Sequence, residues 1–205
     1  MDRNIVLDKI DQIRRSIPDA KTLPNIYLLH GDYTNEEINN LYNHKKVKAM
    51  INLTKGEGFG RPLLEFSLTK KPVIATNWSG HTDFLSDEYS VLLPGNLHNV
   101  DDSAHVKDMI MKEFQWFGVD SRSASLAMKD VYVNYKNYKE KAVRQAYKSK
   151  TEFSFGKMVE QIEHYLDKYV PEMPYQVELN LPSLKKVSSP KPSELKLPKL
   201  KTVNQ

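Results

Sequence analysis

Two carboxylates flank a glycine-rich loop, and this is the pattern in the chain best suited to chemistry. Glu57 and Glu65 have seven residues between them, and glycines stand at positions 56, 58 and 60. Glycine lets a backbone N–H group approach a ligand closely, because no Cβ is in the way. Ionised carboxylates accept hydrogen bonds and repel phosphate. A ligand that satisfies both glutamates should therefore carry hydroxyl groups on each side of an anionic centre.

The flanking residues indicate where this loop lies. Residues 47–53 form an apolar run with the length and β-branched content of a buried strand. Pro62 stands where a helix would begin, because its fixed φ suits the first helical position. A helix N-terminus adds partial positive charge, so the loop has the features of a phosphate cradle. Together with the two glutamates, the cradle fits a sugar nucleotide.

The same residues also have an explanation without a ligand. Glu65 lies in the first turn of its helix, where the helix dipole favours an acidic side chain by about 0.3–1 kcal/mol. The glycines would then serve only a tight turn between strand and helix. The residue types alone leave both interpretations open.

A longer run of residues resembles a known family. The segment Glu57-Gly-Phe-Gly-Arg-Pro-Leu-Leu-Glu65 is followed by Pro-Val-Ile-Ala at 72–75 and then by Gly80 and Asp83. In this order and spacing they resemble the donor-site signature of retaining glycosyltransferases with the GT-B fold. The similarity covers about residues 25–169 and thins toward its C-terminal end. It implies transfer of a sugar from a nucleotide diphosphate sugar, with retained anomeric configuration and with no metal or other cofactor.

The resemblance implies a role for each loop residue. Glu65 would bind the ribose hydroxyls, and Glu57 would lie at the donor sugar as the catalytic position. Backbone amides from Gly58 to Arg61 would meet sugar hydroxyls and phosphate. The donor-binding residues implied are Gly56, Glu57, Gly58, Phe59, Gly60, Arg61, Pro62, Leu63 and Glu65. Further candidates in this and neighbouring loops are Gly31, Asp32, Lys55, Gly80 and His81.

Three of these candidates have plain alternatives. Arg61 stands where the family more often has an apolar residue, and its guanidinium either meets a phosphate or is a solvated surface group. His81 either hydrogen-bonds a phosphate or moves a proton, or it packs against Trp78 or caps the following helix. Lys55 either offsets diphosphate charge or is solvated.

Composition narrows the class of protein. The chain has 205 residues, of which 40% are apolar, enough for one ordinary domain with a core. It has no cysteine, its six histidines lack metal-ligand spacing, and no apolar run reaches the length of a membrane span. The net charge of +4 is concentrated in residues 171–205, where six lysines outnumber three glutamates. We therefore expect a cytoplasmic protein with no metal site and no nucleic-acid-binding stripe.

The order of apolar patterns predicts an α/β fold. In chain order we expect a helix at 2–17, a strand at 26–29, a helix after a capping box of Thr34 and Glu37, a strand at 47–53, a helix at 62–70, strands at 73–76 and 90–93, and helices from 101 to 169. Strands that alternate with helices indicate a Rossmann-like parallel sheet. The loops at 31–34, 54–61 and 77–83 follow strands, so we expect all three to converge at one edge of the sheet.

Two apolar stripes are expected within the helical region. The first consists of Val106, Met109, Ile110 and Phe114. The second consists of Phe155, Met158, Val159, Ile162, Tyr165 and Leu166, and it ends before Pro171.

The resemblance also exposes missing parts. A GT-B enzyme has two Rossmann-like domains, and this chain resembles a truncated C-terminal domain without the two strands that carry an arginine and a lysine for the diphosphate. In the sheet order of the fold, those strands would lie between residues 26–29 and 47–53. Unpaired backbone inside a sheet is costly. We therefore expect direct pairing of these two strands, completion by a partner chain, or a truncated reading of a longer gene.

The composition changes after residue 170, which predicts a domain boundary there and an extended or disordered tail at 171–205. The resemblance implies that residues 1–170 are a partial nucleotide-sugar-binding domain. The tail holds six of the eleven prolines. Within it, residues 178–187 match residues 194–203 at seven of ten positions. The repeat fits a peptide that docks twice, or a low-complexity tail with chance similarity.

Two functions remain open on this sequence. One is the donor-binding half of a glycosyltransferase with an unknown acceptor. The other is a non-catalytic scaffold that keeps a sugar-nucleotide fold and engages a partner through its repeated tail.

Overall fold

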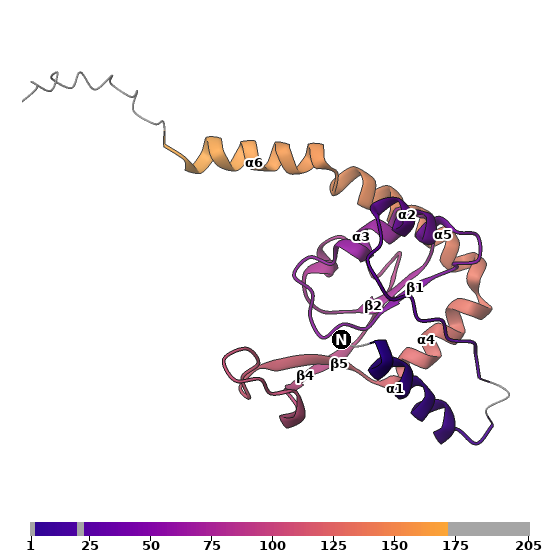
Figure 1. The fold of residues 1–205 in the computed structure, drawn as a ribbon. Helices are drawn as coiled ribbons and strands as arrows, with labels where there is room; N and C mark the ends of the chain where they lie inside the picture. Colours follow the sequence, from indigo (N-terminus) through magenta and orange to yellow (C-terminus); the bar gives the residue numbers. More distant parts are fainter. Residues whose placement is uncertain (1–2, 20–22, 172–205) are drawn as a thin grey trace, which may run out of the picture. The chain divides into compact units, whose positions relative to one another are not determined.

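The computed structural model describes residues 3–19 and 23–171 (Figure 1). The chain divides into two compact units, Met1–His164 and Tyr165–Gln205. The expected tail at 171–205 lies almost entirely outside the described residues. The first unit holds both sheets and is an α/β domain of the Rossmann-like kind, as the alternation of apolar patterns predicted.

A three-stranded parallel sheet forms the centre of this unit. Its strands are β1 (Met50–Asn52), β2 (Val73–Thr76) and β3 (Val91–Leu93), in the order β1-β2-β3. The middle strand β2 is buried along its whole length, as an apolar run in a parallel sheet should be. The predicted strand at 73–76 is thus confirmed, and those at 47–53 and 90–93 are confirmed in shorter form.

Two hydrophobic clusters cover the two faces of the sheet. On one face, Leu63 and Phe66 of α3 (Arg61–Ser67) pack with Val73 and Ala75 of β2. On the other face, Ile74 and Leu93 pack with α4 (Ser121–Val133), which contributes Ala124 and Val131. Alternate residues of β2 therefore pack into the hydrophobic clusters on opposite faces of the sheet.

A buried polar network joins the long helix α5 (Tyr135–Glu152) to this scaffold. The amide of Gln145 is 2% exposed and donates to the Phe84 carbonyl at 2.8 Å and to the Ser149 hydroxyl at 3.1 Å. Its Oε1 accepts from the Ser86 N–H at 2.9 Å and from the Ser90 hydroxyl at 3.1 Å. Every hydrogen-bonding group of this amide is satisfied, which a buried amide requires.

The N-terminal region follows the prediction only in its helices. Helix α1 (Arg3–Ser16) is present, and α2 (Asn35–Asn43) begins with the expected capping box of Thr34 and Glu37. The strand expected at 26–29 is wrong, because these residues form no strand and Ile26, Tyr27 and Leu29 are exposed. Strand β1 pairs with β2 and not with residues 26–29, so direct pairing, one of the three expected alternatives, does not occur.

Residues 95–119 form a hairpin, although helices were expected from residue 101 onward. Strands β4 (Gly95–Asn99) and β5 (Gln115–Val119) pair antiparallel, with the short 3₁₀ helix η3 (Asp102–Ala104) between them. The predicted helical stripe of Val106, Met109, Ile110 and Phe114 is therefore wrong. Val106 and Ile110 instead form an isolated antiparallel bridge.

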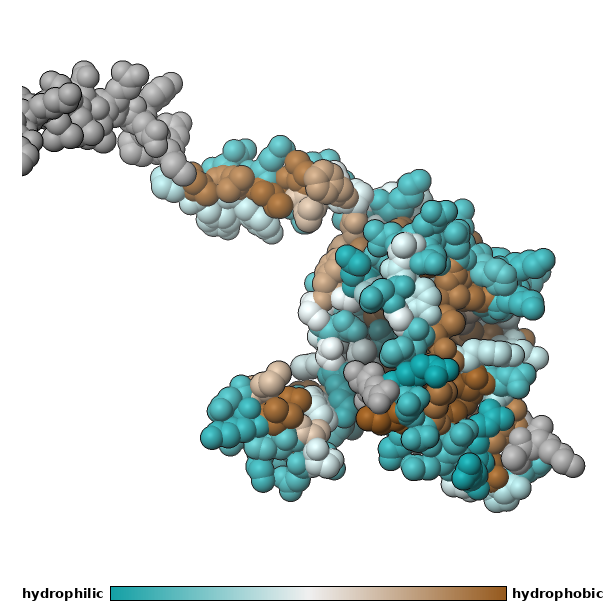
Figure 2. Space-filling model, in the orientation of Figure 1, coloured by the Kyte–Doolittle hydropathy of each residue, from teal (hydrophilic) through white to brown (hydrophobic). Residues whose placement is uncertain are grey.

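The last helix, α6 (Phe155–Tyr169), confirms the second predicted stripe and ends before Pro171. It has no buried residue, and Figure 2 shows apolar side chains along its exposed surface. Among the described helices, none has the length and apolar content needed to cross a bilayer.

Candidate functional site

The glycine loop after β1 is tied to the loop after β2 through Glu57. The backbone N–H of Glu57 donates to the Ser79 hydroxyl at 3.0 Å, and that hydroxyl also donates to the Glu57 carbonyl. The Glu57 carbonyl further accepts from the Gly80 N–H at 3.1 Å. Two of the three loops that were expected to converge therefore meet at the carboxyl edge of the sheet.

Two glycines are required by this contact. A Cβ on Gly80, the first residue of the 3₁₀ helix η2 (Gly80–Asp83), would lie 2.0 Å from the Gly58 carbonyl oxygen. Gly60, the N-cap of α3, has φ +83° and would bring a Cβ within 3.0 Å of the His81 Cβ. Both positions need glycine for the fold itself.

Gly56 and Gly58 differ from these two. A Cβ built on either one meets no atom within 4 Å, and neither has a positive φ. The folded chain gives no steric or conformational reason for glycine there. The open space beside their backbone is available to a ligand.

The Glu57 side chain is half-buried at the end of β1. Its Oε1 accepts a long hydrogen bond, 3.4 Å, from the Asn52 amide, whose own oxygen accepts from the Thr54 N–H at 3.0 Å. Asn52 and Ser79 thus orient Glu57 from both sides. Sequence reasoning missed both residues, although Asn52 stands at the end of the predicted strand and Ser79 directly precedes Gly80.

Glu65 pairs with Arg61 on the first turns of α3. The Arg61 Nε lies 3.1 Å from the Glu65 Oε1, and both side chains are largely exposed. Burial raises the pKa of Tyr42, with the negative charge of Glu65 adding to the increase and Arg61 opposing it. Arg61 is therefore both solvated and engaged with the carboxylate that the resemblance assigns to the ribose.

The side chain of His81 is fully buried. Its Nε2 lies 2.6 Å from the Thr76 carbonyl oxygen, which can only accept, so Nε2 carries the proton. In the neutral ring Nδ1 is then an acceptor, and it is buried without a hydrogen-bond partner in the described part of the chain. The Thr54 hydroxyl oxygen is in the same situation.

The hairpin that the sequence did not predict packs against both loops. The Lys55 Nζ lies 3.6 Å from the centroid of the Trp116 ring, and the Phe117 N–H donates to the Lys55 carbonyl at 3.2 Å. Trp78 stacks on Phe117 at 5.5 Å, with 6° between the ring planes. Lys55 and Trp78 are thus held in place by β5.

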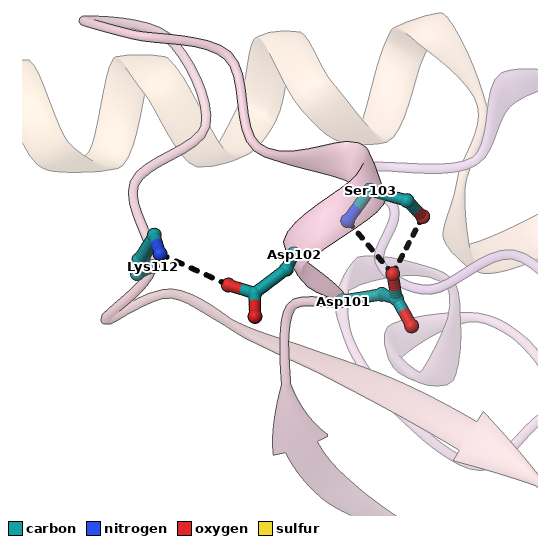
Figure 3. A network of polar contacts seen from close by, with 4 residues as sticks. All are labelled: Asp101, Asp102, Ser103 and Lys112. Carbon is teal, nitrogen blue, oxygen red and sulfur yellow. Dashed lines mark hydrogen bonds and ion pairs between the residues drawn. The ribbon is translucent and has the colours of Figure 1, made fainter.

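The far end of the hairpin has its own polar contacts (Figure 3). Asp101 accepts from the N–H and the hydroxyl of Ser103, and Lys112 lies 3.1 Å from Asp102. Hydrogen bonds from Ser103 hold the pKa of Asp101 below its usual value, with a smaller contribution from the charge of Lys55.

The remaining candidates are Phe59 and Leu63, which differ in burial, and Gly31 and Asp32, which belong to the loop at 31–34. Phe59 is 45% exposed and packs on Phe84 at 5.3 Å, whereas Leu63 is fully buried in the core. Gly31 lies in open space, and the hydrogen bonds of the described residues do not join Gly31 or Asp32 to the glycine loop. The structure therefore gives no support for a third converging loop at 31–34.

Among the described residues, no group of three or more His, Asp or Glu side chains lies close enough together to hold a metal ion. Comparison with protein-family models gave no match, and comparison with curated proteins gave none.

Proposed function

We propose that this chain binds a nucleotide diphosphate sugar and supplies the donor half of a retaining glycosyltransferase of the GT-B kind. The observation that carries the proposal is the contrast among the four glycines around Glu57. Gly60 and Gly80 are needed by the fold, whereas Gly56 and Gly58 are not. A ligand lying against their backbone explains why side chains are missing there.

The residues around the open loop have suitable chemistry for such a ligand. The Glu65 carboxylate has free acceptor capacity beyond its one contact with Arg61, and vicinal ribose hydroxyls would donate to it. The Arg61 guanidinium offers further N–H donors that would meet a phosphate oxygen. The half-buried carboxylate of Glu57, oriented by Asn52 and Ser79, would accept from hydroxyls of the donor sugar.

A second candidate is a non-catalytic binding protein with the same fold. It is favoured by the parallel sheet, in which no described strand pairs with the side of β1 that faces away from β2. In that case the glycine loop would be a feature of the fold without a bound nucleotide.

Calorimetric titration of the full chain with UDP-, GDP- and ADP-sugars tests the proposal. We expect saturable binding of one class, weakened by about 1–3 kcal/mol in Glu65→Ala, the size of a hydrogen bond to a charged group. The matched control is Glu88→Ala, which removes an exposed glutamate outside the two loops. Absence of binding by a folded chain would favour the second candidate.

A further inference from the structure

Strand β1 leaves one edge of the parallel sheet open. The Met50 N–H donates to the Pro72 carbonyl at 3.0 Å, so the backbone groups of Met50 and Asn52 face β2. Backbone direction alternates along a strand, so the N–H and C=O groups of Ala49, Ile51 and Leu53 face away from β2. These three residues are exposed, and no other described strand pairs with β1. The edge is a row of unused donors and acceptors.

An apolar groove of about 550 Å³ runs beside this edge. Ile51, which is 42% exposed, and Ile74 form its floor, and Met128, Tyr132 and Tyr135 form its wall. Figure 2 shows apolar surface in the part of the view where Figure 1 places β1 and α4. Helix α4 covers the β2–β3 side of this face and leaves the β1 side uncovered. A strand added to β1 would turn alternate side chains into this groove.

Positive charge lies at the end of the edge where β1 begins. Lys48 lines the groove, and its carbonyl accepts from the Tyr135 hydroxyl at 3.2 Å. Burial lowers the pKa of Lys71, and the charges of Lys48 and Lys139 lower it further. The charges of Lys48 and Lys139 therefore act unfavourably on the Lys71 ammonium, which donates to the carbonyls of Tyr42 and His44. A carboxylate from a docked segment would relieve this repulsion.

We propose that the open edge of β1 and its groove bind an extended segment of a second copy of this chain, with the sequence Glu-Leu-x-Leu-Pro. This segment occurs at residues 178–182 and again at 194–198. In a parallel arrangement the glutamate lies beside Lys48 and Lys71. The two leucines, which are two residues apart, enter the groove together, and the proline ends the pairing because it has no N–H.

The number of motifs favours a second copy over closure of a chain on itself. Each chain has two motifs, whereas the groove lies beside only one of the two edge strands of the parallel sheet, β1, and not beside β3. A chain that bound its own motif would occupy the groove with one motif and leave the second motif unbound. Two motifs sixteen residues apart instead let one chain engage other molecules with increased avidity.

Sedimentation equilibrium of the full chain tests the proposal. We expect self-association in the micromolar range, weakened roughly tenfold or more by Ile51→Lys in the groove and by the double change Leu179→Asp and Leu195→Asp in the motifs. Matched controls are Leu97→Lys, an equally exposed apolar residue on β4, and Ser188→Asp with Ser189→Asp outside the motifs. A mixture of the two defective variants should associate, because the intact motifs of one meet the intact edge of the other.

A peptide of residues 176–187 tests the backbone pairing without altering the protein. The peptide should dissociate the wild-type assembly. Two singly N-methylated peptides, one methylated at position 179 and one at position 180, should then differ: one should lose this effect and the other should keep it, because only alternate N–H groups face the same neighbouring strand. A chain that stays monomeric across the micromolar range would overturn the proposal, as would association that Ile51→Lys and the motif changes leave unaffected. Equal effects of the two N-methyl groups would also contradict it.

Discussion

Glu57 and Ser79 hold each other through hydrogen bonds in both directions. The Glu57 N–H donates to the Ser79 hydroxyl, and the same hydroxyl donates to the Glu57 carbonyl. Ser79 has φ +80°, a backbone conformation that is strained for any residue other than glycine. Because the two residues come from different loops, this strained contact determines where the carboxylate of the candidate site stands.

Two substitutions of Ser79 distinguish the effect of its hydrogen bonds on stability from the effect of its backbone strain. Ser79→Ala keeps the strained backbone and leaves the half-buried Glu57 N–H without its partner, at an expected cost of about 1–3 kcal/mol in unfolding free energy. Ser79→Gly loses the same bonds but relieves the strain, so it should be the more stable of the two variants. Urea unfolding measures both, and a glycine variant less stable than the alanine variant would contradict the interpretation.

Gly80→Ala should be destabilising although it adds a single methyl group. Its Cβ would overlap the Gly58 carbonyl oxygen, and the loops must move apart at an expected cost of about 1–3 kcal/mol. Thermal unfolding measures the effect. Gly156→Ala is a suitable control, since the nearest atom to its Cβ is 4.0 Å away. Equal melting temperatures for the two variants would show that the loops are not in close contact.

Gln145→Leu should be among the most destabilising single changes in the domain. It strips hydrogen bonds from four groups, the Phe84 carbonyl, the Ser86 N–H and the hydroxyls of Ser90 and Ser149. The Ser149 hydroxyl still accepts from Ser67, but at about 1–3 kcal/mol for each buried group left without a partner we expect a loss of several kcal/mol. Val143→Ala on the exposed side of α5 should change stability little. A mild effect of Gln145→Leu would mean that the network is already hydrated.

Acid should weaken the domain partly through Asp120, the N-cap of α4. The Ser123 N–H donates to its carboxylate at 2.8 Å, and this bond holds the pKa of Asp120 below its usual value of 3.8. A carboxyl whose pKa is lower in the folded state stabilises fully above its unfolded pKa, and this stability is lost as the pH falls through the folded pKa. The loss should therefore occur below about pH 4. Asp120→Asn keeps the cap without titrating, so its melting temperature should fall less steeply between about pH 6 and pH 2. Identical slopes would rule out this contribution.

Local signals in the sequence were sufficient where the structure is determined locally. The capping box of Thr34 and Glu37 predicted the start of α2, because its bonds lie within four residues. The run Val73–Thr76 predicted β2, because a strand buried on both faces must be apolar throughout.

Non-local pairing explains the errors. Residues 26–29 are as apolar as β2, but a strand exists only where a neighbour supplies hydrogen bonds, and none does so here. The spacing of Val106, Met109, Ile110 and Phe114 fits a helix, yet these residues connect two paired strands. Gly95 and Gly118 carried the missed signal. A Cβ on Gly95 would lie 2.1 Å from the Gly118 carbonyl oxygen, and glycine in a strand often marks such a close approach.

The sequence predicted the turn between β1 and α3, but not the long-range contacts that hold this turn in place. The glycines and the proline between Glu57 and Glu65 predicted a strand-to-helix turn, because glycine and proline act on their own backbone. The contacts of Glu57 with Ser79, and of Lys55 with Trp116, join residues far apart in the sequence. Such long-range contacts leave no periodic pattern in the sequence, and sequence reasoning therefore missed them.

The most direct test of nucleotide-sugar binding is calorimetric titration of Gly58→Ala beside the wild-type chain. Since the added Cβ meets no protein atom within 4 Å, the variant should unfold at the same temperature as the wild type. It should nevertheless bind the sugar nucleotide roughly tenfold or more weakly, a loss of at least about 1.4 kcal/mol, because the methyl group occupies the space of the ligand. Unchanged affinity in a folded Gly58→Ala variant would contradict the account and show that the ligand does not lie against this loop.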